Sequence, residues 1–113
     1  MHELSLAQNI IELLEEQAIN HQFIKVKQVW LDIGISACVE IAALKFGLDI
    51  AARNTVAENA VFHINIESAQ GWCLSCNQSF ISKSTKILCP YCNSGMVQIN
   101  DSSRMSIREI EVL

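Results

Sequence analysis

Two Cys-x-x-Cys pairs constrain this chain more than any other feature: Cys73 with Cys76, and Cys89 with Cys92, separated by residues 77–88. Each pair places two thiolates on one side of a tight turn, and two facing turns complete a tetrahedron suited to Zn²⁺. A rubredoxin-like iron site and a pair of redox disulfides are the alternatives. Because a closed four-cysteine site has no open coordination position, the spacing predicts a structural metal rather than a catalytic one.

Composition narrows the class of protein. The chain has 113 residues, half of them apolar, which indicates one domain with a small appended module. Five cysteines, an odd number, fit a metal in a reducing compartment better than a disulfide framework, and Cys38 is expected to be a small buried apolar residue. No run approaches ~20 apolar residues, and Glu3 and Glu12 interrupt the N-terminal segment. We therefore expect no signal peptide, no membrane span and a cytoplasmic location.

Two helices are predicted from apolar periodicity. The first covers residues 5–21, with Ser5 as N-cap and Gln8 completing a capping box. The second covers about 37–51 and is capped by Ser36. The apolar stripes are Leu6, Ile10, Leu13, Leu14 and Ala18 in the first helix, and Val39, Ala43, Phe46, Leu48 and Ile50 in the second.

Three strands are predicted, over residues 26–34, 61–69 and about 105–113. In the second, Phe62, Ile64 and Ile66 point to one face and His63, Asn65 and Glu67 to the other. The order favours an α/β (α+β) fold, an open three-stranded sheet with two helices on one face. Its α/β domain comprises 1–70 and 97–113. The cysteine module, 71–96, is a zinc-ribbon-like insertion whose ends must lie close together, with zinc supplying that closure.

The first three residues also carry metal chemistry. The α-amine of Met1 is partly neutral at cellular pH. Together with the deprotonated amide and the imidazole of His2, it can chelate one ion, and Glu3 offers a fourth donor. Planar, nitrogen-rich ligation of this kind favours Ni(II) or Cu(II) over Zn²⁺.

The order of these features resembles the HypA/HybF nickel metallochaperones along essentially the whole chain. The resemblance rests on the MHE start, the segments VWLDIG and SACVE, the C-x₂-C-x₁₂-C-x₂-C module and the terminal SIREIEV. It implies delivery of Ni(II) as cargo during [NiFe] hydrogenase maturation, with a HypB-like GTPase and the hydrogenase large-subunit precursor as partners. A homodimer and service to urease are left open.

The resemblance also assigns residues. His2 corresponds to the essential nickel ligand, with the Met1 amine and Glu3 nearby, and Glu40 matches an acidic residue implicated in some members. The ligands of the structural zinc are Cys73, Cys76, Cys89 and Cys92. Several relatives carry a histidine after the second cysteine of a pair, where this chain has Asn77 and Asn93. Zinc should still bind, but Asn does not titrate.

Other functional classes have less support. A zinc-ribbon module for nucleic acid conflicts with a net charge of −4. The sequence shows no set of nucleophile, general base and orienting group, so it does not suggest an enzyme. His63 is expected to meet solvent or a neighbour, His21 to lie favourably at a helix end, and Glu12, Glu15 and Glu16 to form a solvated face.

Overall fold

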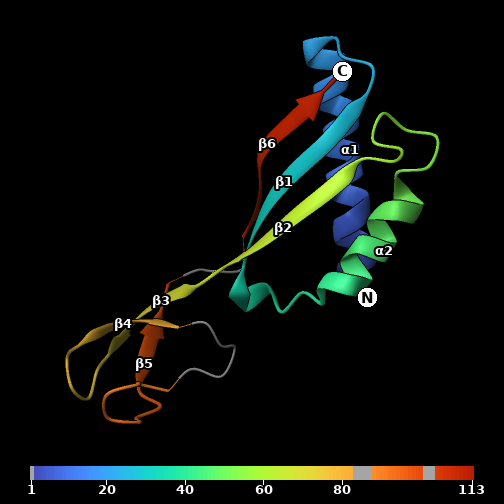
Figure 1. Cartoon of the computed structure of the whole chain (residues 1–113). Helices are drawn as coiled ribbons and strands as arrows, with labels where there is room; N and C mark the ends of the chain where they lie inside the picture. The colour runs from blue at the N-terminus through green and yellow to red at the C-terminus, as the bar shows by residue number, and fades with distance from the viewer. Residues whose placement is uncertain (1, 83–87, 101–103) are drawn as a thin grey trace. The chain divides into compact units, whose positions relative to one another are not determined.

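The structure is a computed structural model that describes residues 2–82, 88–100 and 104–113. Two α-helices, a 3₁₀ turn and six strands follow one another along the chain (Figure 1). They are α1 (His2–His21), β1 (Val26–Gly34), η1 (Ile35–Ala37), α2 (Ile41–Ala51), β2 (Val61–Glu67), β3 (Ala69–Cys73), β4 (Ser79–Ser82), β5 (Val97–Ile99) and β6 (Met105–Val112). The predicted α+β class is confirmed.

The larger sheet has the strand order β2-β1-β6. β1 and β2 run in the same direction and β6 returns in the opposite one, while α1 and α2 lie on one face (Figure 1). Strand β1 directs Val29, Leu31 and Ile33 into the core, and β2 alternates between half-buried and exposed residues as its sequence predicts. The three-stranded sheet with two helices is therefore the one expected from the hydrophobic periodicity.

Helix α1 begins earlier than predicted. It starts at His2, so Ser5 lies inside the helix and is not its N-cap. Glu3 in the first turn favours this start, because a carboxylate interacts well with the positive end of the helix dipole. The prediction of Leu13 as a core residue is also wrong, since it is 41% exposed. The helix buries Ala7, Ile10, Ile11, Leu14 and Ala18.

Helix α2 begins later than predicted. Residues 35–37 form the short turn η1, and Cys38 adopts a left-handed conformation with φ 52°, which a helix cannot continue through. The N-cap is therefore Glu40, whose side chain accepts a hydrogen bond from the Ala43 N–H, and not Ser36. Cys38 is exposed, so its prediction as a buried residue is wrong.

The buried face of α2 also differs from the predicted one. Phe46 is 68% exposed and Ile50 is exposed as well, whereas Leu44, Gly47 and Leu48 are buried. Helices α1 and α2 pack closely at Gly47, where an added Cβ would lie 3.2 Å from the Ala7 Cβ. Gly47 has a low helix propensity, but its lack of a side chain allows the backbones of α1 and α2 to approach each other.

A second antiparallel sheet, with the order β4-β3-β5, includes strands of the cysteine module and residues just outside its predicted bounds, and the sequence did not predict it. Gly71 pairs with Phe80 on one side and Ile99 on the other, and an added Cβ would lie 2.5 Å from the Phe80 ring. Pairing of Cys73 with Val97 joins β3 to β5. The ends of the module are therefore closed by strand pairing, and not by zinc alone as the sequence suggested.

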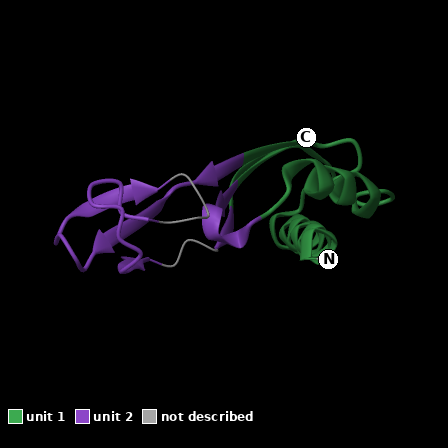
Figure 2. Cartoon of the chain, turned by 90° about the horizontal axis from the view of Figure 1, so that it is seen from below, with its two compact units in different colours: residues 1–31, 39–64, 107–113 green, residues 32–38, 65–106 purple. Residues whose placement is uncertain are grey.

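The chain divides into two compact units (Figure 2). Unit 1 comprises residues 1–31, 39–64 and 107–113, and unit 2 comprises 32–38 and 65–106. Within the described part of the chain, no helix combines the length and apolar character needed to cross a membrane.

The assignment of the α2 core face can be tested with two matched truncations. Leu44→Ala removes a side chain that is fully buried and should lower the free energy of unfolding by about 2–5 kcal/mol. Phe46→Ala removes a larger but exposed side chain and should change it by less than about 0.5 kcal/mol. Urea denaturation of both variants measures the difference, and a larger loss for Phe46→Ala would contradict the assignment.

Candidate metal centres

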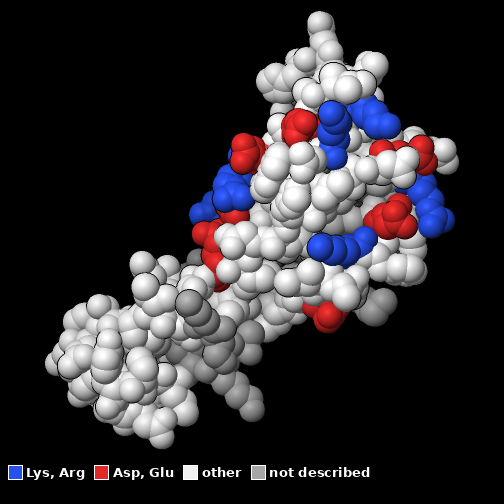
Figure 3. Space-filling model, in the orientation of Figure 1, with Lys and Arg blue, Asp and Glu red and all other residues white. Residues whose placement is uncertain are grey.

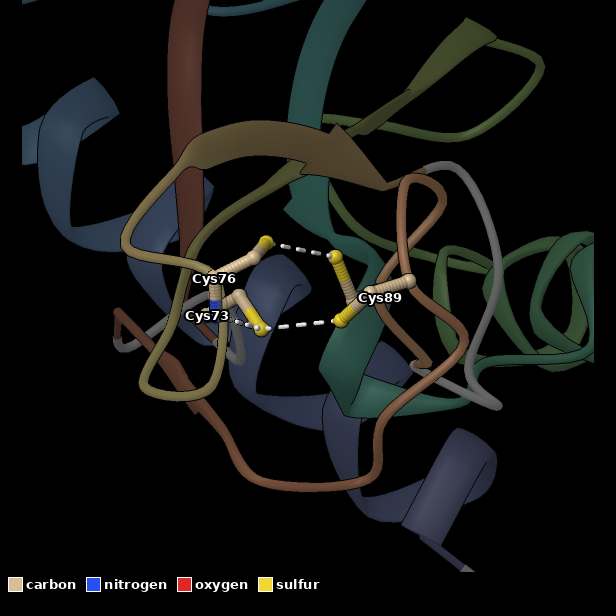
Figure 4. Close-up of side chains that lie close together, drawn as sticks. Cys73, Cys76 and Cys89 are labelled. Carbon is tan, nitrogen blue, oxygen red and sulfur yellow. Dashed lines mark hydrogen bonds between the residues drawn. The ribbon is translucent and has the colours of Figure 1, made fainter.

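Four cysteine sulfurs converge in unit 2. The Sγ atoms of Cys73, Cys76, Cys89 and Cys92 all lie within 4.8 Å of one another, and the side chains labelled in Figure 4 point toward a common centre. Two of the sulfur–sulfur distances, Cys73 to Cys92 and Cys76 to Cys89, are 3.6 Å. Tetrahedral Zn²⁺ with bonds of ~2.3 Å holds its sulfurs about 3.8 Å apart. The cluster therefore has the donor set and size that zinc requires.

Two backbone turns of the same design present these sulfurs. In the first, the Cys73 N–H donates to Gln78 O, and the Asn77 N–H donates to Cys73 O, both at 2.9 Å. The second repeats the pattern, because the Cys89 N–H donates to Ser94 O at 2.9 Å and the Asn93 N–H to Cys89 O at 2.8 Å. Each Cys-x-x-Cys pair is thus held in its turn by hydrogen bonds of its own local backbone.

The residue after each second cysteine closes its turn in a left-handed conformation. Asn77 has φ 57° and Asn93 has φ 62°. After glycine, asparagine tolerates this region best, because its short polar side chain can hydrogen-bond locally. The two asparagines that stand where several relatives have histidine therefore suit the geometry of the turn itself.

Local hydrogen bonds set the thiol pKa values apart. The Cys76 N–H donates to Cys73 Sγ at 3.4 Å and lowers the pKa of Cys73. Burial opposes ionisation of Cys89, but the N–H groups of residues 92 and 91 lower its pKa to about 6. Burial, followed by the neighbouring thiols, raises the pKa of Cys76 to about 12. Backbone hydrogen bonding thus favours the ionised form of one thiol in each pair, Cys73 and Cys89.

The Cys92 thiol completes this pattern. The Ser94 N–H acts to lower its pKa, but the hydrogen bond with Cys73 and burial outweigh that contribution and leave the pKa of Cys92 raised. A divalent cation would have to displace the protons of Cys76 and Cys92, which are the two thiols that favour the neutral form.

The predicted nickel residues lie at the start of α1. His2 is exposed, with its Nε2 atom 3.4 Å from Glu3 Oε2. The same Glu3 oxygen accepts a hydrogen bond from the Glu40 N–H at 3.2 Å. This bond, then that of its own backbone N–H, and to a smaller degree the charge of His2, hold the pKa of Glu3 below its ordinary value. Met1 lies outside the described residues.

Glu40 has a structural role in addition to its predicted nickel role. Its backbone N–H donates to Glu3, and its carboxylate accepts the Ala43 N–H at 2.5 Å as the N-cap of α2. Three of the predicted nickel residues are therefore connected, His2 to Glu3 by a 3.4 Å ion-pair contact and Glu3 to Glu40 by a hydrogen bond.

The remaining histidines and glutamates behave mostly as predicted. His63 meets a neighbour, stacking on Trp30 with ring centroids 5.0 Å apart, and its Nε2 lies 2.7 Å from Gln28 Oε1. His21 is in the last turn of α1. Glu12 and Glu16 are exposed, but Glu15 is half-buried and accepts the Val56 N–H, so its prediction as a solvated residue is wrong.

One interaction on the open face of the larger sheet had no sequence signal. The Gln28 Nε2 donates to Glu111 Oε2 at 2.6 Å, across 83 positions of the chain. Periodicity indicates that these side chains share the polar face of the sheet, but only the strand order brings β1 beside β6.

An α+β domain carrying an inserted four-cysteine cluster defines a small metal-binding protein with a zinc-ribbon-like module. The family model described as "Hydrogenase/urease nickel incorporation, metallochaperone, hypA" matches residues 1–112. The chain belongs to this HypA family, and the predicted resemblance is confirmed.

Relatives match along nearly their full length. The hydrogenase maturation factor HypA of Psychromonas ingrahamii is 43% identical over 112 residues, covering 99% of this chain and 98% of that protein. The hydrogenase maturation factor HybF of Salmonella typhimurium is 37% identical over 112 residues, covering 99% of both chains. These relatives are named maturation factors and not enzymes, in line with the prediction of a non-enzymatic protein.

Solved structures share the fold. The solution structure of the Ni metallochaperone HypA from Helicobacter pylori has a TM-score of 0.68 and 24% identity, covering 98% of this chain and 97% of that one. A second solution structure, of a HypA protein, has a TM-score of 0.68 and 25% identity, covering 100% of this chain and 97% of that one.

The left-handed turns can be tested at Asn77. Asn77→Val should lower the free energy of unfolding by about 1–2 kcal/mol, because a β-branched residue pays the full cost of positive φ. Asn77→Gly should be close to neutral, since glycine adopts this conformation without strain. Thermal denaturation of zinc-loaded protein measures both, and equal losses would show that the side chain rather than the backbone matters.

Proposed function

We propose that this chain carries Ni(II) at its N-terminus and delivers it during hydrogenase maturation, while the four cysteines hold a structural zinc. Membership of a nickel-incorporation metallochaperone family supports the class of function. The observation that carries the nickel site is the exposed His2 beside the partly buried Glu3 in the first turn of α1. We place this activity in the cytoplasm.

The start of a helix offers the donors that planar nickel ligation needs. The first four N–H groups of an α-helix have no intrahelical acceptor, so the amides of His2 and Glu3 are free of helix hydrogen bonding. Those amide nitrogens, the His2 imidazole and the Met1 amine together form a nitrogen-rich set, which favours Ni(II). The Glu3 carboxylate can replace its own amide as the fourth donor.

The same position keeps the cargo exchangeable. The His2 side chain is 57% exposed, so an incoming ligand from another protein can reach the metal. The positive end of the α1 dipole opposes a bound cation, whereas the ionised Glu3 favours one. We include Glu40 as a further ligand in some states, through its Oε1 atom, because its Oε2 atom accepts the Ala43 N–H.

The proposed partners follow from the family's role. A HypB-like GTPase would act with this chain, and the hydrogenase large-subunit precursor would receive the nickel. The description of the family model also names urease, so urease is a second candidate acceptor of the nickel. The proposal leaves self-association as a homodimer open, and sedimentation analysis of the purified chain would measure it.

Zinc would replace a core that unit 2 lacks. Its buried apolar cluster contains only Cys73, Phe80 and Cys89 among the described residues, with Cys76, Val97 and Ile99 partly buried around it. When bound, zinc supplies charge neutralisation and a cross-link between the two turns. In small zinc-binding peptides such a site contributes on the order of 10 kcal/mol of folding free energy.

The zinc assignment predicts one zinc per chain and selective loss of unit 2 on chelation. Cys89→Ser should lose zinc and disorder β3–β5, while the helical signal is retained, because the helices pack around apolar residues and contain none of these cysteines. Metal analysis and circular dichroism measure the two effects. Affinity should rise from about pH 6 to about pH 8, since fewer protons then compete for the thiols. Iron in place of zinc would refute the assignment.

The nickel assignment predicts that His2→Ala abolishes specific Ni(II) binding while zinc content and melting temperature stay unchanged. His21→Ala is the matched control, because it removes an exposed histidine from the other end of the same helix. An added N-terminal tag should also weaken binding, since it consumes the Met1 amine. Calorimetric titration of untagged protein measures the affinity, and nickel retained by a tagged His2→Ala variant would refute the proposal.

A further inference from the structure

The small sheet of unit 2 has an aromatic centre on its outer face. Trp72 lies on the middle strand β3 and is 42% exposed, although tryptophan is highly buried on average. It pairs with Ser79 on β4 and with Gln98 on β5, so small or polar residues stand on both sides of the indole. Alternation places Gln70 and Ile81 on the same face, with Ile81 66% exposed.

These residues line a groove of about 840 Å³. Trp72, Ile81 and Tyr91 supply its apolar contacts, and Gln70, Gln98 and Asn100 supply amide groups. The groove is shallow and open to solvent, so a segment of chain lying along it would keep one side in water. A folded partner surface would instead need a flat contact of about 800 Å² on each side.

The groove lies in a part of the chain that carries no charge. No Asp, Glu, Lys or Arg occurs in residues 68–82 and 88–100, the described parts of the module. Lys83 and Lys86 fall between them, outside the described residues. Figure 3 shows this region white on the visible face, in contrast to the many charges around α1, α2 and the larger sheet. All six groove residues named above belong to the uncharged ranges.

We propose that this groove binds an uncharged, extended segment of the protein that receives the nickel. Only the identity of that partner rests on the proposed function. A nucleic acid or an anionic membrane surface would need cations that the lining does not have. The apolar and amide side chains of the groove suit a polypeptide in an extended or polyproline II conformation. Such a chain presents apolar side chains and unpaired peptide groups together.

The complementarity can be described group by group. Trp72 and Tyr91 offer large apolar surfaces with few rotatable bonds, and each keeps a polar atom that can hydrogen-bond at the rim. The side chains of Gln70 and Gln98 each carry a donor and an acceptor, which suits the N–H and C=O groups of a peptide. A neutral contact of this kind should bind with little dependence on salt.

Matched variants test the proposal in the full-length, zinc-loaded chain. Trp72→Thr and Ile81→Thr remove the apolar contacts but keep good strand formers. Ile24→Thr is the control, because it makes the same change at an 80% exposed isoleucine in unit 1. The probe is the purified hydrogenase large-subunit precursor, and its affinity for nickel-free chaperone is measured by calorimetry. Zinc content and melting temperature of each variant establish that the fold is retained.

We expect Trp72→Thr to weaken precursor binding at least about tenfold and Ile81→Thr to weaken it several-fold, with Ile24→Thr unchanged. Affinity should stay within about twofold between about 0.05 M and about 0.5 M salt. Wild-type-like binding by both groove variants, equal loss in Ile24→Thr, strong salt dependence, or no binding by the wild type would overturn the proposal. So would conversion of a dimer to a monomer by Trp72→Thr in sedimentation analysis, which would assign the groove to a second copy.

Failure of the docking proposal is distinguishable from failure of the nickel proposal. Binding of the precursor is measured without nickel, whereas the nickel site is measured by titration in the absence of precursor. Trp72→Thr should leave the Ni(II) affinity unchanged, and His2→Ala should leave the precursor affinity unchanged. The two functions therefore fail independently.

Discussion

The convergence of four thiol sulfurs is the interaction on which the cysteine module depends. Its sheet has short strands, and its buried cluster consists of Cys73, Phe80 and Cys89 with a few partly buried neighbours. Such a small apolar core cannot offset the loss of chain entropy by itself. The backbone turns reduce the remaining cost, because each Cys-x-x-Cys pair is already shaped by its own hydrogen bonds. A bound metal would join the two turns and supply the remaining stability.

The N-terminal region is built on the opposite principle. Four sulfurs converge in unit 2, with Cys73 and Cys89 buried, whereas His2 is exposed and has few neighbouring donors. A resident ion needs enclosure and a complete ligand set, while a cargo ion needs access for an exchanging ligand. Under the proposed function, the two sites would take different divalent metals, since thiolates suit zinc and a planar nitrogen set suits nickel.

Regular alternation and motif spacing were read correctly, whereas the helix caps and starts and the pairing of distant strands were not. The alternation in β2 and the cysteine spacing correctly indicated a strand and a sulfur cluster. Strands β3 and β5 were missed because they are short and exist through their mutual register. The exposed Phe46 and the buried Leu44 both fit a helical period, so only the packing against Ala7 at Gly47 decides which face is covered. Capping by Ser36 failed because Cys38 turns the chain left-handed before α2 begins.

The place where the chain enters and leaves the small sheet of unit 2 bears on how such chains arise. Gln70 and Asn100 form two reciprocal hydrogen bonds there. The Asn100 N–H donates to Gln70 O and the Gln70 N–H donates to Asn100 Oδ1, both at 3.0 Å. The chain therefore enters and leaves the module at a single point, like a closed hairpin. A segment with paired ends can be gained, lost or exchanged by recombination without changing the path of the strands on either side of it.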